Sequence, residues 1–362
     1  MVWLSGVRRV GKTALTQQLP ARYFDCELPS IRKEVEGEAF LKECGKGLIV
    51  LDEIHRLQNP TQILKIAADH YPQVKIVATG SSTLEASKKF RDTLTGRKYS
   101  VWLTPMNSLD GVYFGIRDIQ TRLRLGGLPP FILSGAFDEP AYQEWIDSFW
   151  AKDIQELFRV ERRYSFIKFV ELLMQQSGGI FEATRFSGPC EVSHTTITNY
   201  LSVLEATHLA HIIRPYSTRR SGEIIASPKV YGFDTGFITL FKGWGELRNE
   251  DYGLLWEHYV LNELHSLLEP REIHYWRDKA GHEMDWVIKI RGKDPIAIEC
   301  KWKEESWGWS SLLSFRHRHP QGENYLISAD NNQARTIEKE GILLHKINIQ
   351  GLREIFQKND DV

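Results

Sequence analysis

The chain has 362 residues, enough for two or three domains that each bury a hydrophobic core. Its 46 basic and 47 acidic side chains nearly cancel, which excludes binding of polyanions through overall charge and confines any nucleic-acid surface to a local patch. The four cysteines are scattered without a C-x-x-C pair, which argues against disulfide and metal–thiolate frameworks and indicates a reducing compartment. We read no signal peptide and no apolar run of membrane-spanning length, and therefore expect a cytoplasmic protein with no membrane partner.

A phosphate-binding loop opens the chain. The stretch Gly6–Thr13 reads G-x-x-x-x-G-K-T and follows the apolar run Val2–Leu4. Its glycines let backbone N–H groups converge on an anion, and a helix opening at Lys12 adds its positive dipole end. Lys12 would then reach the β- and γ-phosphates of ATP, and the Thr13 hydroxyl would hold Mg²⁺. The nucleotide-binding residues predicted here are Gly6, Val7, Arg8, Arg9, Val10, Gly11, Lys12 and Thr13. A glycine-rich turn with a solvated lysine is the alternative, but the order strand, loop, helix favours the phosphate-binding loop.

A second motif lies in the stretch 47–53, where four consecutive apolar residues precede Asp52 and Glu53. This pattern predicts a strand that is buried on both faces and ends at a site. In a P-loop fold it is the Walker B strand, whose Asp52 binds the Mg²⁺ shell and whose Glu53 orients or polarises the attacking water. Buried strands also end in acids that cap helices, but the two motifs in one chain favour ATP binding.

The remaining strands complete an α/β core over residues 1–105. A helix is expected over Lys12–Leu19, with further strands over Arg22–Leu28, Val74–Thr79 and Lys98–Leu103. Strands that alternate with helices predict a doubly wound parallel sheet.

Three polar residues of this core are further site candidates. Thr79 or Ser81 is a candidate sensor of the γ-phosphate, although a helix N-cap explains either residue equally well. Arg97 could stabilise charge on a transferring phosphoryl group, from its own subunit or from a neighbour in a homo-oligomer, or it could simply be a solvated arginine in a turn.

With these motifs the chain resembles a known group, the predicted AAA+ superfamily ATPases of bacteria and archaea. These proteins couple a P-loop core to a C-terminal domain of uncharacterised, nuclease-like type. The stretches that carry the resemblance are Gly6–Thr13, Leu48–Ile54, Ala78–Ser82, Leu94–Arg97 with Leu103 and Pro105, Gly126–Pro129, Pro228–Gly236 and Gly253–Leu264. Relatives usually carry a helical segment before the P-loop, so we expect this sequence to be truncated or its start to be misassigned. His55 stands where the family tends to have glutamine.

The middle of the chain reads as two helical parts. Residues 106–165 suit the helical lid subdomain that follows such ATPase cores, with Arg122 and Arg124 on a solvated helix face. Residues 166–226 read as a winged helix-turn-helix whose third helix would be capped by Ser193. Polar residues on its open face could bond base edges, and two arginines on the expected wing could touch phosphates; these are His194, Thr195, Thr198, Asn199, Ser202, Arg219 and Arg220. DNA contact and a structural spacer remain open alternatives.

Glu257 is the sharpest residue-level signal in the last part, residues 227–362. On the helix expected over Asp251–Leu268, it lies within a stripe of Leu254, Leu261, Leu264 and Leu268 at intervals of three and four. Unpaired burial of a carboxylate costs several kcal/mol, so this acid needs a metal or a cation as partner. On the following strand, alternation places Met284, Trp286 and Ile288 on one face and Asp285 on the other. On the next strand, Glu299 and Lys301 point away from Ile296, Ile298 and Cys300.

The order helix, three strands, helix, strand resembles the PD-(D/E)xK nuclease core. The family's motif then falls on Asp285 and Glu299-x-Lys301, with Glu257 from the first helix. By that resemblance, Glu257, Asp285 and Glu299 form a metal site for Mg²⁺ or Mn²⁺, and Lys301 positions a nucleophilic water. An ordinary charged strand face with an internal Glu–Lys ion pair is the alternative, and the scaffold also occurs as an inactive binder.

Three hypotheses follow. The first is an AAA+-like ATPase that hydrolyses ATP with Mg²⁺ and associates with DNA or RNA, with Lys12, Glu53 and Arg97 as its catalytic residues. The second is a metal-dependent nuclease that the P-loop domain gates. The third is a non-catalytic, nucleotide-switched DNA-binding regulator.

Overall fold

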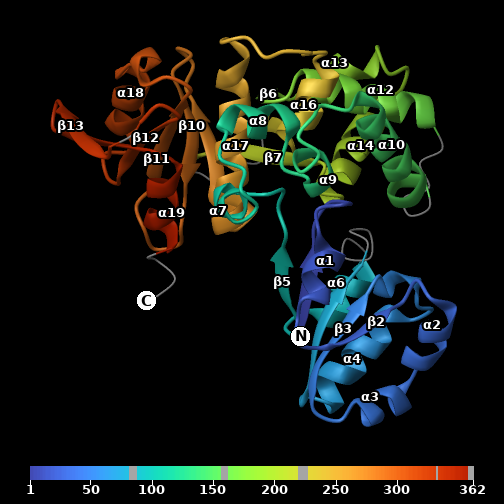
Figure 1. Ribbon diagram of the computed structural model, residues 1–362. Helices are drawn as coiled ribbons and strands as arrows, with labels where there is room; N and C mark the ends of the chain where they lie inside the picture. Colours follow the sequence, from blue (N-terminus) through green and yellow to red (C-terminus); the bar gives the residue numbers. More distant parts are fainter. Residues whose placement is uncertain (81–87, 156–161, 219–226, 332, 358–362) are drawn as a thin grey trace. The chain divides into compact units, whose positions relative to one another are not determined.

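The computed structural model describes residues 1–80, 88–155, 162–218, 227–331 and 333–357 (Figure 1). The chain divides into two compact units. The first unit contains residues 1–104, 143–161 and 202–209, and the second contains residues 105–142, 162–201 and 210–362. Within the described part of the chain, no helix combines the length and the apolar character needed to cross a membrane.

The first unit is built on a parallel sheet whose described strands follow the order β2-β3-β4-β1-β5. The strands are β1 (Val2–Ser5), β2 (Arg22–Asp25), β3 (Gly47–Asp52), β4 (Val74–Thr79) and β5 (Tyr99–Trp102). In a parallel sheet all the strands end at one edge, so the loops after β1, β3 and β4 meet there. This sheet confirms the predicted parallel α/β core. The helix expected over Lys12–Leu19 and the strand expected over Arg22–Leu28 are shorter in the structure.

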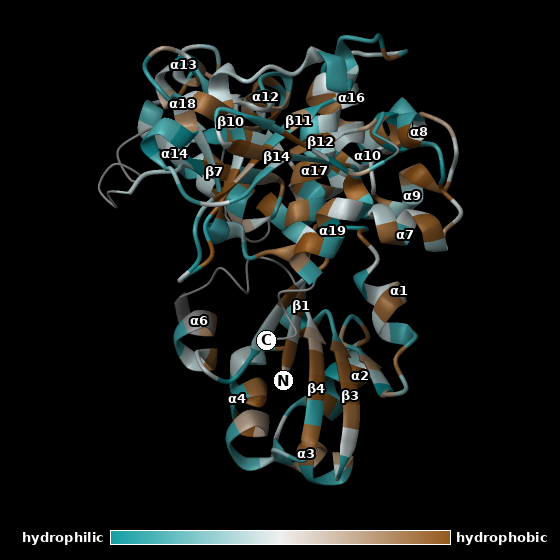
Figure 2. Ribbon diagram, turned by 90° about the vertical axis from the view of Figure 1, so that its left-hand side faces the viewer, coloured by the Kyte–Doolittle hydropathy of each residue, from teal (hydrophilic) through white to brown (hydrophobic). Residues whose placement is uncertain are grey.

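Helices connect these strands and bury their apolar residues against the sheet. They are α1 (Lys12–Gln17), α2 (Pro29–Val35), α3 (Glu38–Cys44), η1 (Ile54–Arg56), α4 (Pro60–His70) and α6 (Lys88–Leu94). The central strands β3 and β4 of this sheet are mostly apolar (Figure 2). Trp3, Ile49 and Ile76 from the strands pack in one core with Leu41 and Leu64 from α3 and α4. The unit also takes in the end of α10 (Glu139–Phe149), the π-helix η2 (Trp150–Gln155) and the end of α14 (His194–Ala206).

The second unit is built on a mixed sheet. Its described strands are, in spatial order, β13 (Arg335–Lys339), β14 (Ile342–Ile347), β12 (Asn324–Ser328), β11 (Ile296–Lys301), β10 (Glu283–Ile288), β9 (Ile273–Arg277), β7 (Ala210–Pro215), β8 (Lys229–Gly232) and β6 (Gly179–Ile180). Strands β9, β10 and β11 are antiparallel neighbours, and β12 runs parallel to β11. The sequence predicts a domain boundary between residues 226 and 227, but the sheet continues across it. Strand β7, before this boundary, pairs with β8 and β9, which both follow it.

The helices of the second unit surround this sheet. They are α7 (Ser108–Tyr113), α8 (Ile119–Leu125), α9 (Pro129–Ile132), α12 (Arg163–Gln175), α13 (Ala183–Ser187), α16 (Thr235–Phe241), α17 (Asp251–Leu267), η3 (Pro270–Glu272), η4 (Glu304–Ser306), α18 (Ser310–Arg318) and α19 (Ile349–Gln357). The expected lid segment 106–165 belongs partly to each unit, because the division falls inside α10.

Arg122 is buried and does not lie on a solvated helix face as the sequence predicted. Its guanidinium donates to the Met106 carbonyl, with Nη2 at 2.7 Å.

Asp234 accepts a hydrogen bond from the Gly127 amide at 2.6 Å and caps α16 at Gly236. A Cβ at Gly126 would lie 1.9 Å from the Asp234 carboxylate, so this turn needs glycine. The turn at Gly126 and Gly127 therefore packs directly against Asp234.

A β-bulge changes which residues of β10 share a face. The register of β10 against β9 shifts between Met284 and Val287, so strict alternation fails there. Met284 and Val287 pack in one core with Phe315 of α18, whereas the Trp286 indole donates to the Cys300 sulfur at 3.2 Å. The prediction that Met284 and Trp286 lie on one face is therefore wrong.

Candidate functional site

The loop Gly6–Thr13 leaves the carboxyl end of β1 with two glycines in conformations that side chains disfavour. Gly6 has φ 143°, and a Cβ there would lie 2.5 Å from the Leu103 carbonyl oxygen. Gly11 has φ 108° and forms the N-cap of α1. Val7 and Val10 are buried and anchor the loop. The backbone therefore turns as a phosphate-binding loop requires.

The Lys12 ammonium group lies inside this loop. Its Nζ donates to the carbonyl oxygens of Gly6 at 2.8 Å and Val7 at 3.0 Å. Burial lowers the pKa of Lys12, although the carboxylates of Glu53 and Asp153 oppose the shift. An anion in the loop would offer this lysine a stronger partner than two carbonyls.

Asp52, at the end of β3, is the hub of the site. It is 2% exposed and accepts hydrogen bonds from Thr13 Oγ1 at 2.8 Å and from the Tyr23 hydroxyl at 2.5 Å. The Thr79 hydroxyl, at the end of β4, donates to its other oxygen. The structure thus brings together Thr13, Asp52 and Thr79, which the sequence singled out, and adds Tyr23 from β2.

Mg²⁺ prefers oxygen ligands, and Thr13 and Asp52 present a hydroxyl and a carboxylate that already touch. The donor set of these two residues therefore fits the Mg²⁺ ion that a P-loop core implies.

Glu53 follows Asp52 in a left-handed backbone conformation, with φ 51°. Its amide donates to Thr79 Oγ1 at 3.0 Å, and its carboxylate lies 3.1 Å from His55 Nδ1. Burial works to raise the pKa of Glu53, but the hydrogen bond and charge of His55 hold it below its ordinary value. Glu53 is thus kept ionised, as a base that accepts a proton from water must be.

An acidic segment from far along the chain contacts the loop. Arg8 Nε lies 3.0 Å from Asp153 Oδ2 in η2, and the Trp145 indole donates to the Arg8 carbonyl at 3.1 Å. Arg9 pairs with Glu144 of α10 at 2.9 Å. Burial raises the pKa of Asp153. No local pattern in the sequence signals these long-range partners.

Arg97 lies away from the phosphate-binding loop. Strands β1 and β5 are parallel neighbours, and the Tyr99 amide at the start of β5 donates to the Met1 carbonyl at the start of β1. Arg97 therefore lies where these strands begin, whereas the loop lies where β1 ends. Its guanidinium forms a two-point pair with Asp69, with Nε at 2.6 Å from Oδ1 and Nη2 at 3.2 Å from Oδ2. A role for Arg97 toward the loop of its own subunit is therefore wrong, and a role toward a neighbouring subunit stays a prediction. Ser81 lies outside the described residues.

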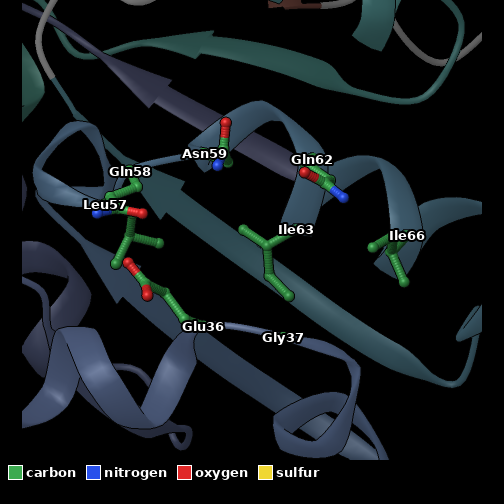
Figure 3. Close-up of a pocket in the computed structure, with 8 residues that line it drawn as sticks. All are labelled: Glu36, Gly37, Leu57, Gln58, Asn59, Gln62, Ile63 and Ile66. Carbon is green, nitrogen blue, oxygen red and sulfur yellow. The ribbon is translucent and has the colours of Figure 1, made fainter.

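A small hollow lies near the Walker B strand but apart from these residues. It measures about 160 Å³ and opens between the turn at Glu36 and the start of α4 (Figure 3). It is lined by Glu36, Gly37, Leu57, Gln58, Asn59, Gln62, Ile63 and Ile66. None of the nucleotide-site residues predicted among the described part of the chain lines this hollow.

The second unit places Glu257, Asp285 and Lys301 around one hollow of about 470 Å³. Lys301 Nζ lies 3.8 Å from Asp285 Oδ2 and 2.9 Å from Glu299 Oε1. The Cys300 amide donates to Asp285 Oδ2 at 2.7 Å. Burial, and next the charge of Asp285, raise the pKa of Glu257 to about 7 and that of Glu299 to about 8.

The predicted three-carboxylate metal group is not formed. Among the described residues, no three His, Cys, Asp or Glu side chains are grouped so as to hold a metal ion. Glu299 is not among the residues that line the hollow. One of its carboxylate oxygens accepts a hydrogen bond from Lys301. Its other oxygen is buried and has no hydrogen-bond partner among the described residues. The carboxylates that line the hollow beside Lys301 include the pair Glu257 and Asp285, and one or two carboxylates with water suffice for Mg²⁺.

Glu257 has partners that the sequence did not suggest. The Tyr231 hydroxyl donates to it at 2.5 Å, and Lys229 Nζ lies 3.8 Å away while also pairing with Glu283. Glu257 is 19% exposed, whereas the fully buried acid of α17 is Glu263. Arg353 and Ser108 both satisfy the Glu263 carboxylate, which gives this acid a structural role.

The winged-helix candidates are only partly described. His194 begins α14 and is exposed, as are Thr195, Thr198, Asn199 and Ser202 along the same helix. Arg219 and Arg220, which were expected on the wing, lie outside the described residues.

A parallel sheet whose loop amides and acidic strand ends meet at one edge defines a P-loop core. Residues 1–109 match the family described as an AAA domain, which supports an AAA+-like ATPase core over this stretch. Residues 116–248 and 252–347 match two families, each described as a domain of unknown function (DUF8612 and DUF4143).

The chain is 26% identical over 317 residues to uncharacterized proteins of Mycobacterium bovis and Mycobacterium tuberculosis, in alignments that cover 83% of this chain and 70% of each relative. Among solved structures, a Walker-type ATPase of Pyrococcus abyssi aligns with 15% identity and a TM-score of 0.41, covering 67% of this chain and 90% of that one. The Orc1 protein of Aeropyrum pernix in complex with DNA aligns with 14% identity and a TM-score of 0.29, covering 67% and 86%.

Proposed function

We propose that this chain binds ATP with Mg²⁺ in the loop Gly6–Thr13 and hydrolyses it. The observation that carries the proposal is the contact between Thr13 of the loop and Asp52 of the acidic strand end, with Lys12 beside them in the same loop. Thr13 and Asp52 would hold the Mg²⁺ ion, which neutralises charge on the phosphates. Lys12 would leave the Gly6 and Val7 carbonyls for the phosphates, and Glu53 would accept a proton from the attacking water.

Replacing Lys12 with alanine is expected to lower the rate of phosphate release at least about 100-fold, because the cation that neutralises transferring charge is lost. Phosphate release and binding of a fluorescent ATP analogue would be measured side by side. Lys46→Ala is the matched control, since Lys46 is an exposed lysine of the same unit. Equal rates for wild type and Lys12→Ala, or no nucleotide binding by wild type, would contradict the proposal.

A second candidate function is cleavage of nucleic acid at the hollow of the second unit. Two observations favour it: Glu257, Asp285 and Lys301 line one hollow, and the order α17, β9, β10, β11, α18, β12 is that of the nuclease core which the sequence resembles. Glu257 and Asp285 would bind a divalent cation that supplies Lewis acidity, and Lys301 would orient a water toward the phosphate. An association with DNA or RNA rests on this site and on the exposed face of α14.

Wild type incubated with plasmid or RNA in Mn²⁺ is expected to cleave at least one of them, and Asp285→Ala is expected to slow cleavage by about 100-fold or more. Asp294→Ala is the control, because Asp294 is an exposed carboxylate in the loop after β10. No cleavage by wild type, or cleavage that Asp285→Ala leaves unchanged, would remove this candidate. DNA retention in a gel without cleavage would instead favour a binding role.

A further inference from the structure

A short segment that lies far from the P-loop in the sequence belongs to the same compact unit. Residues 202–209 are grouped with residues 1–104, and they form the end of α14 and the turn that follows it. His208 closes this turn with φ 59°, and the Leu209 amide donates to the Leu204 carbonyl at 2.8 Å. A left-handed residue at this position ends the helix and fixes the direction of the His208 side chain.

The His208 imidazole stacks on Trp102, with ring centroids 5.1 Å apart and an interplanar angle of 18°. Trp102 is the register partner of Ser5, the residue that immediately precedes the phosphate-binding loop. The next residue, Leu103, donates to the Ser5 carbonyl at 2.9 Å, and its own carbonyl oxygen closes against Gly6. The imidazole therefore stacks on a residue whose partner on β1 immediately precedes the loop.

The surroundings of His208 keep its ring neutral as long as no anion is bound nearby. Burial lowers its pKa to about 4, and the positive charge of Lys12 on α1 adds to this effect. Trp102 on β5 carries no charge, and Glu205 in the preceding turn accepts the His208 amide through its backbone carbonyl. Within the described residues, the ring nitrogens of His208 make no hydrogen bond. An imidazole so placed lacks a polar partner and lies within the field of the lysine expected to bind phosphate.

We infer that His208 contacts the phosphates of the nucleotide bound by the loop Gly6–Thr13, as a positioning residue supplied by the end of α14. This inference rests on the proposed ATP binding and adds a further residue to that site. Burial, and next the charge of Lys12, keep the ring unprotonated; a phosphate beside it would oppose both, so that the ring takes a proton from solvent and donates a charged hydrogen bond to the phosphate.

The test is calorimetric titration of the full chain with Mg²⁺-ADP and with a slowly hydrolysed ATP analogue, in buffers of different ionisation enthalpy at pH 7. Wild type is expected to take up as much as one more proton per nucleotide than His208→Asn and to bind about tenfold more tightly. Asparagine tolerates the left-handed backbone of this residue but does not titrate. His194→Asn, at the exposed start of the same helix, is the control and is expected to behave as wild type.

The outcomes separate this inference from the proposal on which it depends. If wild type and His208→Asn bind nucleotide equally well with equal proton uptake, the inference fails while ATP binding stands. If wild type binds no nucleotide, both fail. A purely structural role would lower the melting temperature of His208→Asn without changing the proton count, and that result would also overturn the inference. Should His208→Asn not fold, His208→Gln makes the same comparison.

Discussion

Replacing Glu53 with glutamine is expected to lower ATP turnover by about 100-fold or more while nucleotide still binds. The glutamine amide has nearly the size of the carboxylate but cannot accept a proton from water. The structure fixes this residue from both sides, because its amide is bonded to Thr79 and its carboxylate to His55. The effect should therefore fall on the chemical step and leave the phosphate-binding loop intact.

The pH profile sharpens this prediction. His55 holds the pKa of Glu53 below its ordinary value, so Glu53 stays ionised from pH 6 to pH 9 and its titration should not reduce wild-type turnover in that range. Single-turnover phosphate release at several pH values would measure this. Glu36→Gln is the control, since Glu36 is an exposed carboxylate of the same unit. Turnover by Glu53→Gln within a few-fold of wild type would show that another group activates the water.

The nucleotide site could be predicted from the sequence where chemistry is local. A glycine-rich loop between a strand and a helix has few structural alternatives, and a buried strand that ends in two acids narrows them further. Thr79 was foreseen because it closes the next buried strand, and parallel strands end at one edge. Its observed bonds, to Asp52 and to the Glu53 amide, give it a positioning role beside the predicted one as a phosphate sensor.

The distant residues that are grouped with the loop in the first unit could not be predicted, because they come from far along the chain. Asp153 and His208 lie more than a hundred residues after the loop, and neither stands in a recognisable motif. Arg97 shows the reverse error, since the sequence of a turn that contains a cation does not show at which end of the sheet that turn lies. Its bond to Asp69 and its place before β5 set it at the far end.

In the second unit, strand alternation placed Glu299 and Lys301 together but failed across the bulge in β10. The helical stripe pointed to Glu257 as a carboxylate in need of a partner, and the structure supplies a lysine and a tyrosine. The sequence does not predict that Lys229 is the partner of Glu257. Strand β8 has four residues, and its pattern does not show that its lysine faces two acids. Side-chain direction over a strand of four residues depends on which neighbours it pairs with.

Lys229→Met is expected to destabilise the second unit by about 2–4 kcal/mol at pH 8, because it leaves the partly buried carboxylates of Glu257 and Glu283 without their cation. The Lys229 side chain is 8% exposed and pairs with Glu283 while lying 3.8 Å from Glu257. Burial works to lower the pKa of Lys229, yet the charges of Glu257, Glu283 and Asp285 raise it, so the lysine is charged at this pH. Methionine preserves most of the packing of the lysine side chain, so the change in stability measures the loss of its charge.

The pH dependence distinguishes this lost charge from lost packing. The folded pKa of Glu257, about 7, already lies above its ordinary value, so its contribution to stability is present at low pH and is lost as pH rises through 7. Removing Lys229 raises that pKa further, so the penalty should be smaller at pH 5.5, where Glu257 is protonated, than at pH 8. Calorimetry should show a melting temperature lowered by roughly 10 °C at pH 8 for a domain of this size, with Lys279→Met, an exposed lysine, near wild type. An equal loss at both pH values would mean that Lys229 does not stabilise the fold through the charge of Glu257 and that Glu257 relies on Tyr231.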